Sequence, residues 1–238
     1  MNVLTIDIGG THVKLLATGE KERREFPSGP EMTPDKMVTL VRKLARDWKY
    51  EVISIGYPGF VLRGRPVAEP HNLGKGWVRY DFERAFKKPV KILNDAAMQA
   101  FGSYVGGKML FLGLGTGLGS AMVVDGVIEP MELAHLPYKK ATFEDYVGLR
   151  GLESLGKKEW RKEVTKVVAA LVSALEPNDV VLGGGNVKKL KELPPGCRAG
   201  DNANAFLGGF RLWQASSRDA AGPDPKPKSR RRTSAARP

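Results

Sequence analysis

Two segments far apart in the chain follow the same plan, and this echo constrains the fold more than any other feature. The segment "TIDIGGTHVKLL" spans residues 5–16, and "LFLGLGTGLGSAMVV" spans residues 110–124. Each begins as an apolar strand, turns on glycines next to a threonine, and continues as a second strand. We therefore expect two halves that each begin with a strand pair joined by a glycine turn.

The rest of the chain alternates between strand and helix patterns. Apolar residues recur at helical spacing over 33–48, and we also predict helices over 158–176 and 202–213. Buried strands are predicted in "EVISIGYPG", "PVKILND" and "DVVLGGG", and "KERREFP" continues the first strand pair as a meander. Such alternation predicts the α/β fold class.

The two glycine turns have a composition that suits phosphate binding. Backbone N–H groups gather on one side of such a turn, and glycine lets an anion approach the backbone closely. Glycine is also the usual residue of hairpin turns, so one turn alone favours an ordinary hairpin. Two turns at equivalent places in the two halves favour phosphate. Neither has the pattern of a P-loop or of a dinucleotide-binding fingerprint.

The segment "LNDAAMQA" at residues 93–100 places Asn94 and Asp95 between a strand pattern and an alanine-rich helix pattern. Asn or Asp at the start of a helix commonly caps its free N–H groups. The same pair of polar side chains also suits the floor of a binding pocket. The local sequence leaves both interpretations open.

Length and composition describe an ordinary globular protein. The 238 residues, 42% hydrophobic and 27% charged, are enough for two modest lobes. We expect a cytoplasmic protein, because no apolar run approaches the roughly 20 residues of a membrane span and "MNVLTIDIGG" lacks the features of a signal peptide. The single cysteine, Cys197, excludes an internal disulfide.

The C-terminal residues 215–238 differ from the rest in composition. They contain seven Lys or Arg and two Asp, within a net charge of +12 for the whole chain. The segment is rich in Pro, Ser, Ala and Arg and has no aromatic residue, so we expect a disordered tail. A basic tail either makes weak contacts with polyanions or serves as a solvated appendage.

Seven short motifs resemble, in order, those of sugar kinases of the ROK family (repressors, open reading frames, kinases). They are "DIGGTHVK", "GYPGFV", "NLGKGW", "LNDAAMQAFG", "LGLGTGLGSAMVVDG", "MELAHLPY" and "VLGGGN", between residues 7 and 186. Within the family the chain is most similar to the polyphosphate glucokinase branch. The resemblance implies the two-lobed actin-like ATPase (ribonuclease H-like) fold, with a mixed sheet in each lobe and a cleft between them.

The resemblance also implies a division of the chain and a set of sugar-binding residues. We expect an N-terminal lobe over 1–93, a C-terminal lobe over 94–214 and the tail over 215–238. Asp95 is the expected catalytic base, which orients the sugar hydroxyl and accepts its proton. The expected sugar-binding residues are Asn72, Asn94, Asp95, Glu132, His135 and Glu144.

The phosphoryl donor is expected at the glycine turns and at a later glycine run. We expect Asp7 to hold Mg²⁺ through water. The expected donor-binding residues are Asp7, Gly9, Gly10, Thr11, Lys14, Gly115, Thr116, Gly117, Gly183, Gly184 and Gly185. The cysteine-rich zinc motif of most ROK kinases is missing, since Cys197 lies far from its place, so we expect no zinc.

The function implied by the resemblance is transfer of a phosphoryl group to the 6-hydroxyl of glucose, from polyphosphate or ATP with Mg²⁺. The alternatives are an ATP-only kinase for another hexose or amino sugar, and a sugar-binding regulator without catalysis. We also expect a homodimer. The lysine pairs, defined as Lys139-Lys140, Lys157-Lys158 and Lys188-Lys189, predict either a basic surface for polyphosphate or ordinary solvation.

Overall fold

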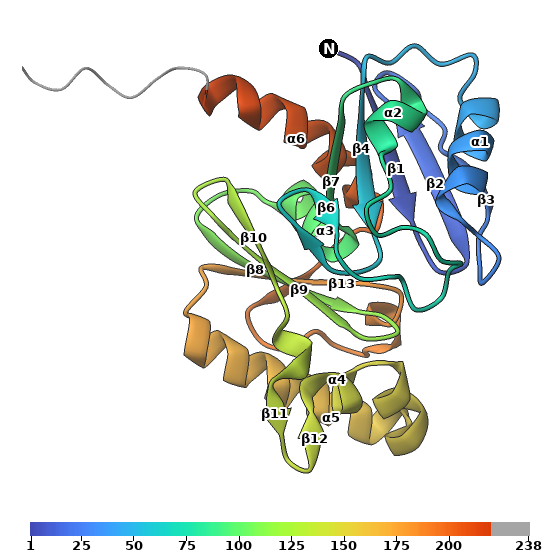
Figure 1. Ribbon diagram of the computed structural model, residues 1–238. Coiled ribbons are helices and arrows are strands. Elements are labelled where there is room, and N and C mark those ends of the chain that lie inside the picture. Colours follow the sequence, from blue (N-terminus) through green and yellow to red (C-terminus); the bar gives the residue numbers. More distant parts are fainter. Residues whose placement is uncertain (220–238) are drawn as a thin grey trace, which may run out of the picture.

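The computed structural model describes residues 1–219, with side chains as far as Gln214. Two five-stranded mixed sheets make up most of the fold (Figure 1). The first contains β1 (Val3–Ile8), β2 (His12–Ala17), β3 (Arg24–Pro27), β4 (Val52–Tyr57) and β7 (Val90–Asn94). The second contains β8 (Lys108–Leu114), β9 (Leu118–Val124), β10 (Val127–Met131), β13 (Asp179–Gly183) and β14 (Cys197–Ala199). The predicted α/β class is confirmed.

The two sheets have the same topology. Their strand orders are β3-β2-β1-β4-β7 and β10-β9-β8-β13-β14. In each sheet the first three strands form an antiparallel meander, and two further strands extend it in parallel. The echo between the two strand pairs in the sequence therefore extends to whole sheets.

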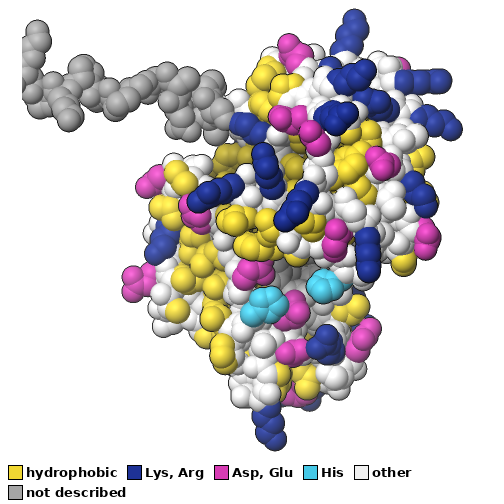
Figure 2. Space-filling view, in the orientation of Figure 1, with side chains coloured by type: hydrophobic (Ala, Val, Ile, Leu, Met, Phe, Trp, Pro, Cys, Tyr) yellow, Lys and Arg dark blue, Asp and Glu magenta, His cyan; other side chains and the backbone are white. Residues whose placement is uncertain are grey.

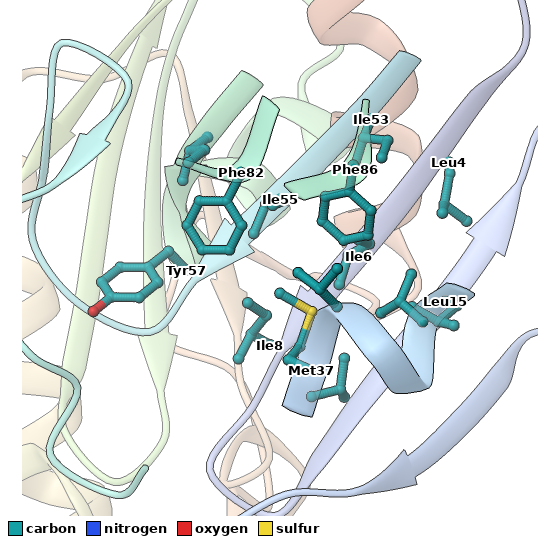
Figure 3. Packing of buried hydrophobic residues seen from close by; sticks show 14 of the residues in the cluster. Leu4, Ile6, Ile8, Leu15, Met37, Ile53, Ile55, Tyr57, Phe82 and Phe86 are labelled. Atoms are coloured by element: carbon teal, nitrogen blue, oxygen red, sulfur yellow. The ribbon is translucent and has the colours of Figure 1, made fainter. Parts of the chain in front are cut away.

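The first sheet is covered on one face by α1 (Pro34–Leu44) and α2 (Phe82–Phe86). Thr33 caps α1 by accepting a hydrogen bond from the backbone N–H of Lys36. Figure 3 shows Met37 of α1 packed beside Ile6 and Ile8 of β1. Because side chains alternate along a strand, Thr5 and Asp7 lie on the opposite face of β1.

That opposite face carries α6 (Asn204–Asp219), which also crosses α3 (Asp95–Ser103) (Figure 1). The hydroxyl of Ser54 donates to the carbonyl of Gly209 over 2.6 Å. A Cβ at Gly208 would collide with the carbonyl of Met98, so glycine is required where the two helices cross. The expected lobe boundaries at 93 and 214 stay a prediction. The expected disordered tail was wrong about its start, because α6 continues through residues 215–219, and the part of the tail beyond 219 lies outside the described residues.

The second sheet lies between α3 on one face and α4 (Phe143–Val147) and α5 (Leu149–Leu175) on the other. Gly156, with φ 70° and ψ 162°, is not helical and divides α5 into two helices, of which the second corresponds to the predicted helix over 158–176. The glycines at 151 and 156 interrupt the helical pattern in the sequence.

The remaining elements are short. The 3₁₀ turn η1 (Leu133–His135) follows β10, and η2 (Val187–Lys189) follows β13. Two small hairpins, β5 (Val61–Leu62) with β6 (Arg65–Pro66) and β11 (Pro137–Tyr138) with β12 (Ala141–Thr142), project from the sheets. None of the described helices combines the length and the hydropathy needed to cross a membrane.

Candidate active site

A cavity of about 890 Å³ lies between the two halves and is lined by residues from both. Its walls come from the two glycine turns, the loop of residues 68–73, the start of α3, and the segment from η1 to the start of α5. Figure 2 shows acidic and histidine side chains gathered around the hollow between the upper and lower parts of the molecule. The expected cleft is therefore present.

Asn94 and Asp95 divide the two roles that the sequence left open. Asn94 is the cap of α3, because its Oδ1 accepts from the N–H groups of Ala96 and Ala97, at 3.0 and 3.2 Å. Its Nδ2 donates to the carbonyl of Gly59, which leaves one amide hydrogen free of these bonds. Asp95 is the first residue of the helix and lines the cavity.

The environment of Asp95 favours its protonated form. Burial raises the pKa of the Asp95 carboxyl to about 7, with a further contribution from the negative charge of Asp7. The N–H of Ala96, which donates to Asp95 Oδ1 over 2.8 Å, opposes this shift without cancelling it. A carboxyl with a pKa near neutrality is suited to exchange a proton with a substrate.

Asp7, the last residue but one of β1, contributes a negative charge to the environment of Asp95. Burial raises its pKa, while the positive charge of Lys14 acts in the opposite direction. Asp7 and Lys14 are directly paired between β1 and β2, so their side chains lie on the same face, with Lys14 Nζ 3.9 Å from Asp7 Oδ2. Lys14 therefore lies on the same face of the sheet as Asp7.

The first glycine turn is held by Ser28, which follows β3, and by its own backbone. Gly9 N–H donates to the carbonyl of His12 over 2.9 Å, and the hydroxyl of Ser28 donates to the carbonyl of Gly9 over 2.6 Å. Gly9 and Gly10 line the cavity. A Cβ at Gly10 would lie 3.2 Å from that of Asn72, so the turn and the loop of residues 68–73 lie against each other.

The second glycine turn is held by the glycine run after β13. Asn186, which is buried, donates from Nδ2 to the carbonyl of Gly115 over 2.8 Å, and its N–H bonds to the carbonyl of Leu114 over 2.9 Å. Gly115, Thr116 and Gly117 all line the cavity.

The glycine run itself is closely packed. Gly184 has a φ of +87°, and a Cβ there would collide with the backbone of Leu114. It lines the cavity. A side chain at Gly183 would collide with the ring of Phe111, whereas Gly185 has open space around it. Close packing therefore explains two of these three glycines, Gly184 against backbone and Gly183 against an aromatic ring.

The four other predicted sugar-binding residues also meet at the cavity. Glu144 lies over the second glycine turn, where its Oε2 accepts from the N–H of Leu118 over 3.3 Å and leaves no room for a side chain at Gly117. Glu132 and His135 are exposed neighbours, with 3.8 Å between Glu132 Oε2 and His135 Nε2. Asn72 lines the cavity from the first half.

All six predicted sugar-binding residues therefore line one cavity, together with six of the predicted donor-binding residues. Those six are Gly9, Gly10, Gly115, Thr116, Gly117 and Gly184. The cavity lining does not include Asp7, Thr11, Lys14, Gly183 or Gly185. Asp7 still acts on the cavity through its charge, which contributes to the pKa of Asp95.

The family model described as "ROK family" matches residues 3–129, more than half of the chain. The chain belongs to the ROK family. A curated relative, polyphosphate glucokinase of Mycobacterium tuberculosis (strain CDC 1551 / Oshkosh), is 28% identical over an alignment that covers 80% of each chain. Polyphosphate glucokinase of Mycobacterium leprae is also 28% identical, over 80% of this chain and 65% of that protein.

Solved structures of other ROK proteins share the fold. The polyphosphate/ATP-glucomannokinase of Arthrobacter sp. strain KM superposes with a TM-score of 0.77 at 22% identity, over 90% of this chain and 99% of that one. A ROK family glucokinase from Streptomyces griseus, in complex with glucose and AMPPNP, gives 0.71 at 15% identity, over 89% and 99%. The predicted two-lobed actin-like ATPase fold is confirmed.

Sequence reasoning missed several polar residues of this ROK site. Glu69, Gln99, Asp145 and Arg150 line the cavity, and Asn186 ties the second glycine turn to the following strand end. Asn186 stands in the quoted motif "VLGGGN", which was a usable signal. Gln99 follows Asp95 by four residues, so helical spacing alone places both on one face of α3.

The acidic residues suit Mg²⁺ shared with a phosphorylated ligand better than a metal held by protein alone. The described residues contain no group of three or more His, Cys, Asp or Glu that could hold a metal ion. Mg²⁺ commonly uses one or two carboxylates and takes its other ligands from water and phosphate, and Asp7 fits that use. The expected lack of zinc and the expected homodimer stay predictions; elemental analysis tests the first.

None of the lysine pairs lines the cavity. Lys139 is held by the buried carboxylate of Glu163, which also accepts hydrogen bonds from Lys166 and Tyr138. Burial by itself would raise the pKa of Glu163, but these hydrogen bonds lower it to about 2. The ammonium of Lys139 therefore helps to hold the β11–β12 hairpin against α5.

Proposed function

We propose that the protein is a sugar kinase that transfers a phosphoryl group to the 6-hydroxyl of glucose, with polyphosphate or ATP as donor. The observation that carries this proposal is Asp95, a carboxyl with a pKa raised to about 7, in a cavity whose walls contain both glycine turns. The named relatives, polyphosphate glucokinases and a polyphosphate/ATP-glucomannokinase, support the choice of sugar and donor.

In the proposed reaction the sugar hydroxyl lies against Asp95 and attacks the terminal phosphorus of the donor. A new O–P bond forms, the bond from phosphorus to the leaving phosphate breaks, and the leaving phosphate keeps the electron pair. Asp95 accepts the hydroxyl proton as the new bond forms, since a carboxylate cannot remove it from an unreacted alcohol of pKa about 16. Mg²⁺, when bound, neutralises phosphate charge.

The side chains around Asp95 have separate proposed tasks. Asn72, Glu132, His135 and Glu144 bind the sugar hydroxyls, and Asn94 contributes its remaining amide hydrogen. The N–H groups of the two glycine turns bind the donor. Closure of the two halves over the ligands would exclude water, which otherwise accepts the phosphoryl group in place of the sugar.

The test is a coupled assay for sugar phosphate, with glucose, mannose, fructose and N-acetylmannosamine as acceptors and ATP or polyphosphate as donors. We expect the highest kcat/KM with glucose, and turnover with polyphosphate. A higher kcat/KM with another sugar would assign the protein to the alternative hexose or amino sugar kinases. Binding of glucose without turnover from either donor would instead indicate a sugar-binding regulator.

The donor can be tested separately through ionic strength. A long polyanion releases counterions when it binds to cations, so its apparent affinity falls steeply with salt. If the basic surface binds polyphosphate, KM for the polymer should rise far more than KM for ATP between low and physiological salt. The double variant Lys188→Glu and Lys189→Glu should then weaken use of the polymer selectively. Equal salt dependence for the two donors would assign the lysine pairs to solvation.

A further inference from the structure

The wall of the cavity is acidic. It includes five carboxylates, those of Glu69, Asp95, Glu132, Glu144 and Asp145, whereas Arg150 is the one Lys or Arg among the described residues that line it. A phosphoryl donor carries a negative charge on each phosphate, and carboxylates at short range repel it. A donor that binds here therefore needs a cation at the wall.

The backbone fixes Arg150 beside the second glycine turn. The N–H of Leu149, the first residue of α5, donates to the carbonyl of Thr116 over 3.0 Å. A Cβ at Gly148 would lie 2.8 Å from that same carbonyl, so the start of α5 is packed directly on the turn. Arg150 is the next residue along the helix.

The guanidinium of Arg150 is anchored from one side. Arg150 Nη1 donates to Asp145 Oδ1 over 2.6 Å. Asp145 Oδ2 accepts from the hydroxyl and the N–H of Thr142, at 2.7 and 3.1 Å, so this carboxylate is itself fixed. The Arg150 side chain is still 79% exposed, which leaves its other N–H groups open at the cavity wall.

Lys14 and Lys139 lie outside the cavity lining and have carboxylate partners of their own. Lys14 faces Asp7 at 3.9 Å, and Lys139 is bound to Glu163. Arginine also differs from lysine in shape, because its planar group presents two parallel N–H donors to a phosphate while a third position stays bound to a carboxylate.

We propose that Arg150 binds the phosphates of the donor where they lie along Gly115, Thr116 and Gly117, and that Asp145 holds its guanidinium in place. Arg150 is thus a donor-binding residue with no part in sugar binding. This inference rests on the proposed function for the identity of the donor, but the site itself is defined by phosphate.

The first measurement is calorimetric binding of inorganic tripolyphosphate to the full chain in the presence of glucose and Mg²⁺. We expect Arg150→Ala to weaken binding about tenfold or more and Arg150→Lys to lie between it and the unaltered protein. The matched control is Lys162→Ala, an exposed cation on the same helix that lies outside the cavity lining and outside the lysine pairs, which should change Kd less than twofold. Thermal melts establish that the variants fold.

The second measurement is steady-state kinetics with glucose. Arg150→Ala should raise KM for the donor by a similar factor while KM for glucose stays within twofold. Tripolyphosphate that fails to bind the unaltered protein, or binds Arg150→Ala equally well, would overturn the inference even if glucose is phosphorylated. Binding that depends on Arg150 without turnover of any sugar would refute the proposed function and leave the phosphate site standing.

Discussion

The two glycine turns occupy the same place in the same topology, yet the residues beside them differ in kind. Just before the first turn, Asp7 of β1 pairs with Lys14 on one side and Gly56 on the other. At the equivalent position before the second turn, Gly113 of β8 pairs with Gly119 and Gly183. One half therefore carries charge where the other carries no side chain.

The glycines at these positions of the second half let α3 approach the sheet. A Cβ at Gly119 would lie only 2.7 Å from the Cβ of Ala96, so the first turn of α3 lies directly on β9. Asp95, which precedes Ala96, is thereby brought to the cavity. The second half therefore positions the proposed base, and the first half contributes the charge of Asp7 to its raised pKa.

Removal of the proposed base should have the largest effect. Asp95→Asn keeps the shape of the side chain but cannot accept a proton, so kcat should fall about 100-fold or more. Steady-state kinetics with sugar binding as control measures this. A kcat within threefold of that of the unaltered protein would remove Asp95 from the mechanism. It would also contradict the roles that we assign to the two halves.

The same variant has a pH signature in stability. The folded pKa of Asp95 lies above its ordinary 3.8, so its contribution to stability is fully present at low pH and is lost as the pH rises through about 7. Asp95→Asn should therefore stabilise the fold at pH 8 by about 1–3 kcal/mol, and less at pH 5. Thermal melts at the two pH values provide the check. An equal shift at both would contradict the raised pKa.

The charged half can be tested at Asp7. Loss of its negative charge removes one of the causes that raise the pKa of Asp95, so Asp7→Asn should move the acidic limb of the kcat/KM profile to lower pH by about one unit. In the unaltered protein kcat/KM should fall tenfold per pH unit below pH 7. We also expect about a tenfold loss of kcat at saturating Mg²⁺. An unmoved limb would mean that the charge of Asp7 does not act on the base.

The close packing of α3 on the glycines of the second half can be tested at Gly119. Its change to alanine forces a methyl group against Ala96, and we expect a loss of about 1–3 kcal/mol of unfolding free energy. Gly113→Ala is the matched control, because its nearest neighbour would be Phe111 Cε1 at an ordinary 3.4 Å. Urea unfolding compares the two. Equal losses would show that close packing of α3 is not specific to Gly119.

The smallest expected effect concerns how each turn is held. Asn186→Ala leaves the carbonyl of Gly115 without its buried donor and should cost about 1–2 kcal/mol, with a higher KM for the phosphoryl donor. Ser28→Ala removes the equivalent support of Gly9 at a less buried place and should cost less. The reverse order in urea unfolding would show that the first turn depends more on its support.

Much of this arrangement could be predicted from the sequence, because the glycine turns and the Asn94-Asp95 pair are local patterns. The orientation of Lys14 could not, since it depends on the strand register that pairs it with Asp7. Arg150 was missed because Gly151 and Gly156 interrupt the helical pattern of the sequence near the start of α5. Helix capping and pocket lining were both considered for the Asn94-Asp95 pair. Only the fold shows that Asn94 caps the helix and that Asp95 lines the cavity.

The position of α6 has a consequence for how the protein is made. This helix is the last described element of the chain, yet it covers the face of the first sheet that carries Thr5 and Ser54. While the ribosome still holds residues 204–219, the first sheet emerges with that face uncovered. Thr5 of β1 and Ser54 of β4 then lack their hydrogen-bond partners in α6, which lie 201 and 155 positions away. A fragment that ends before α6 should therefore be readily digested by protease even where it includes every residue of the proposed site.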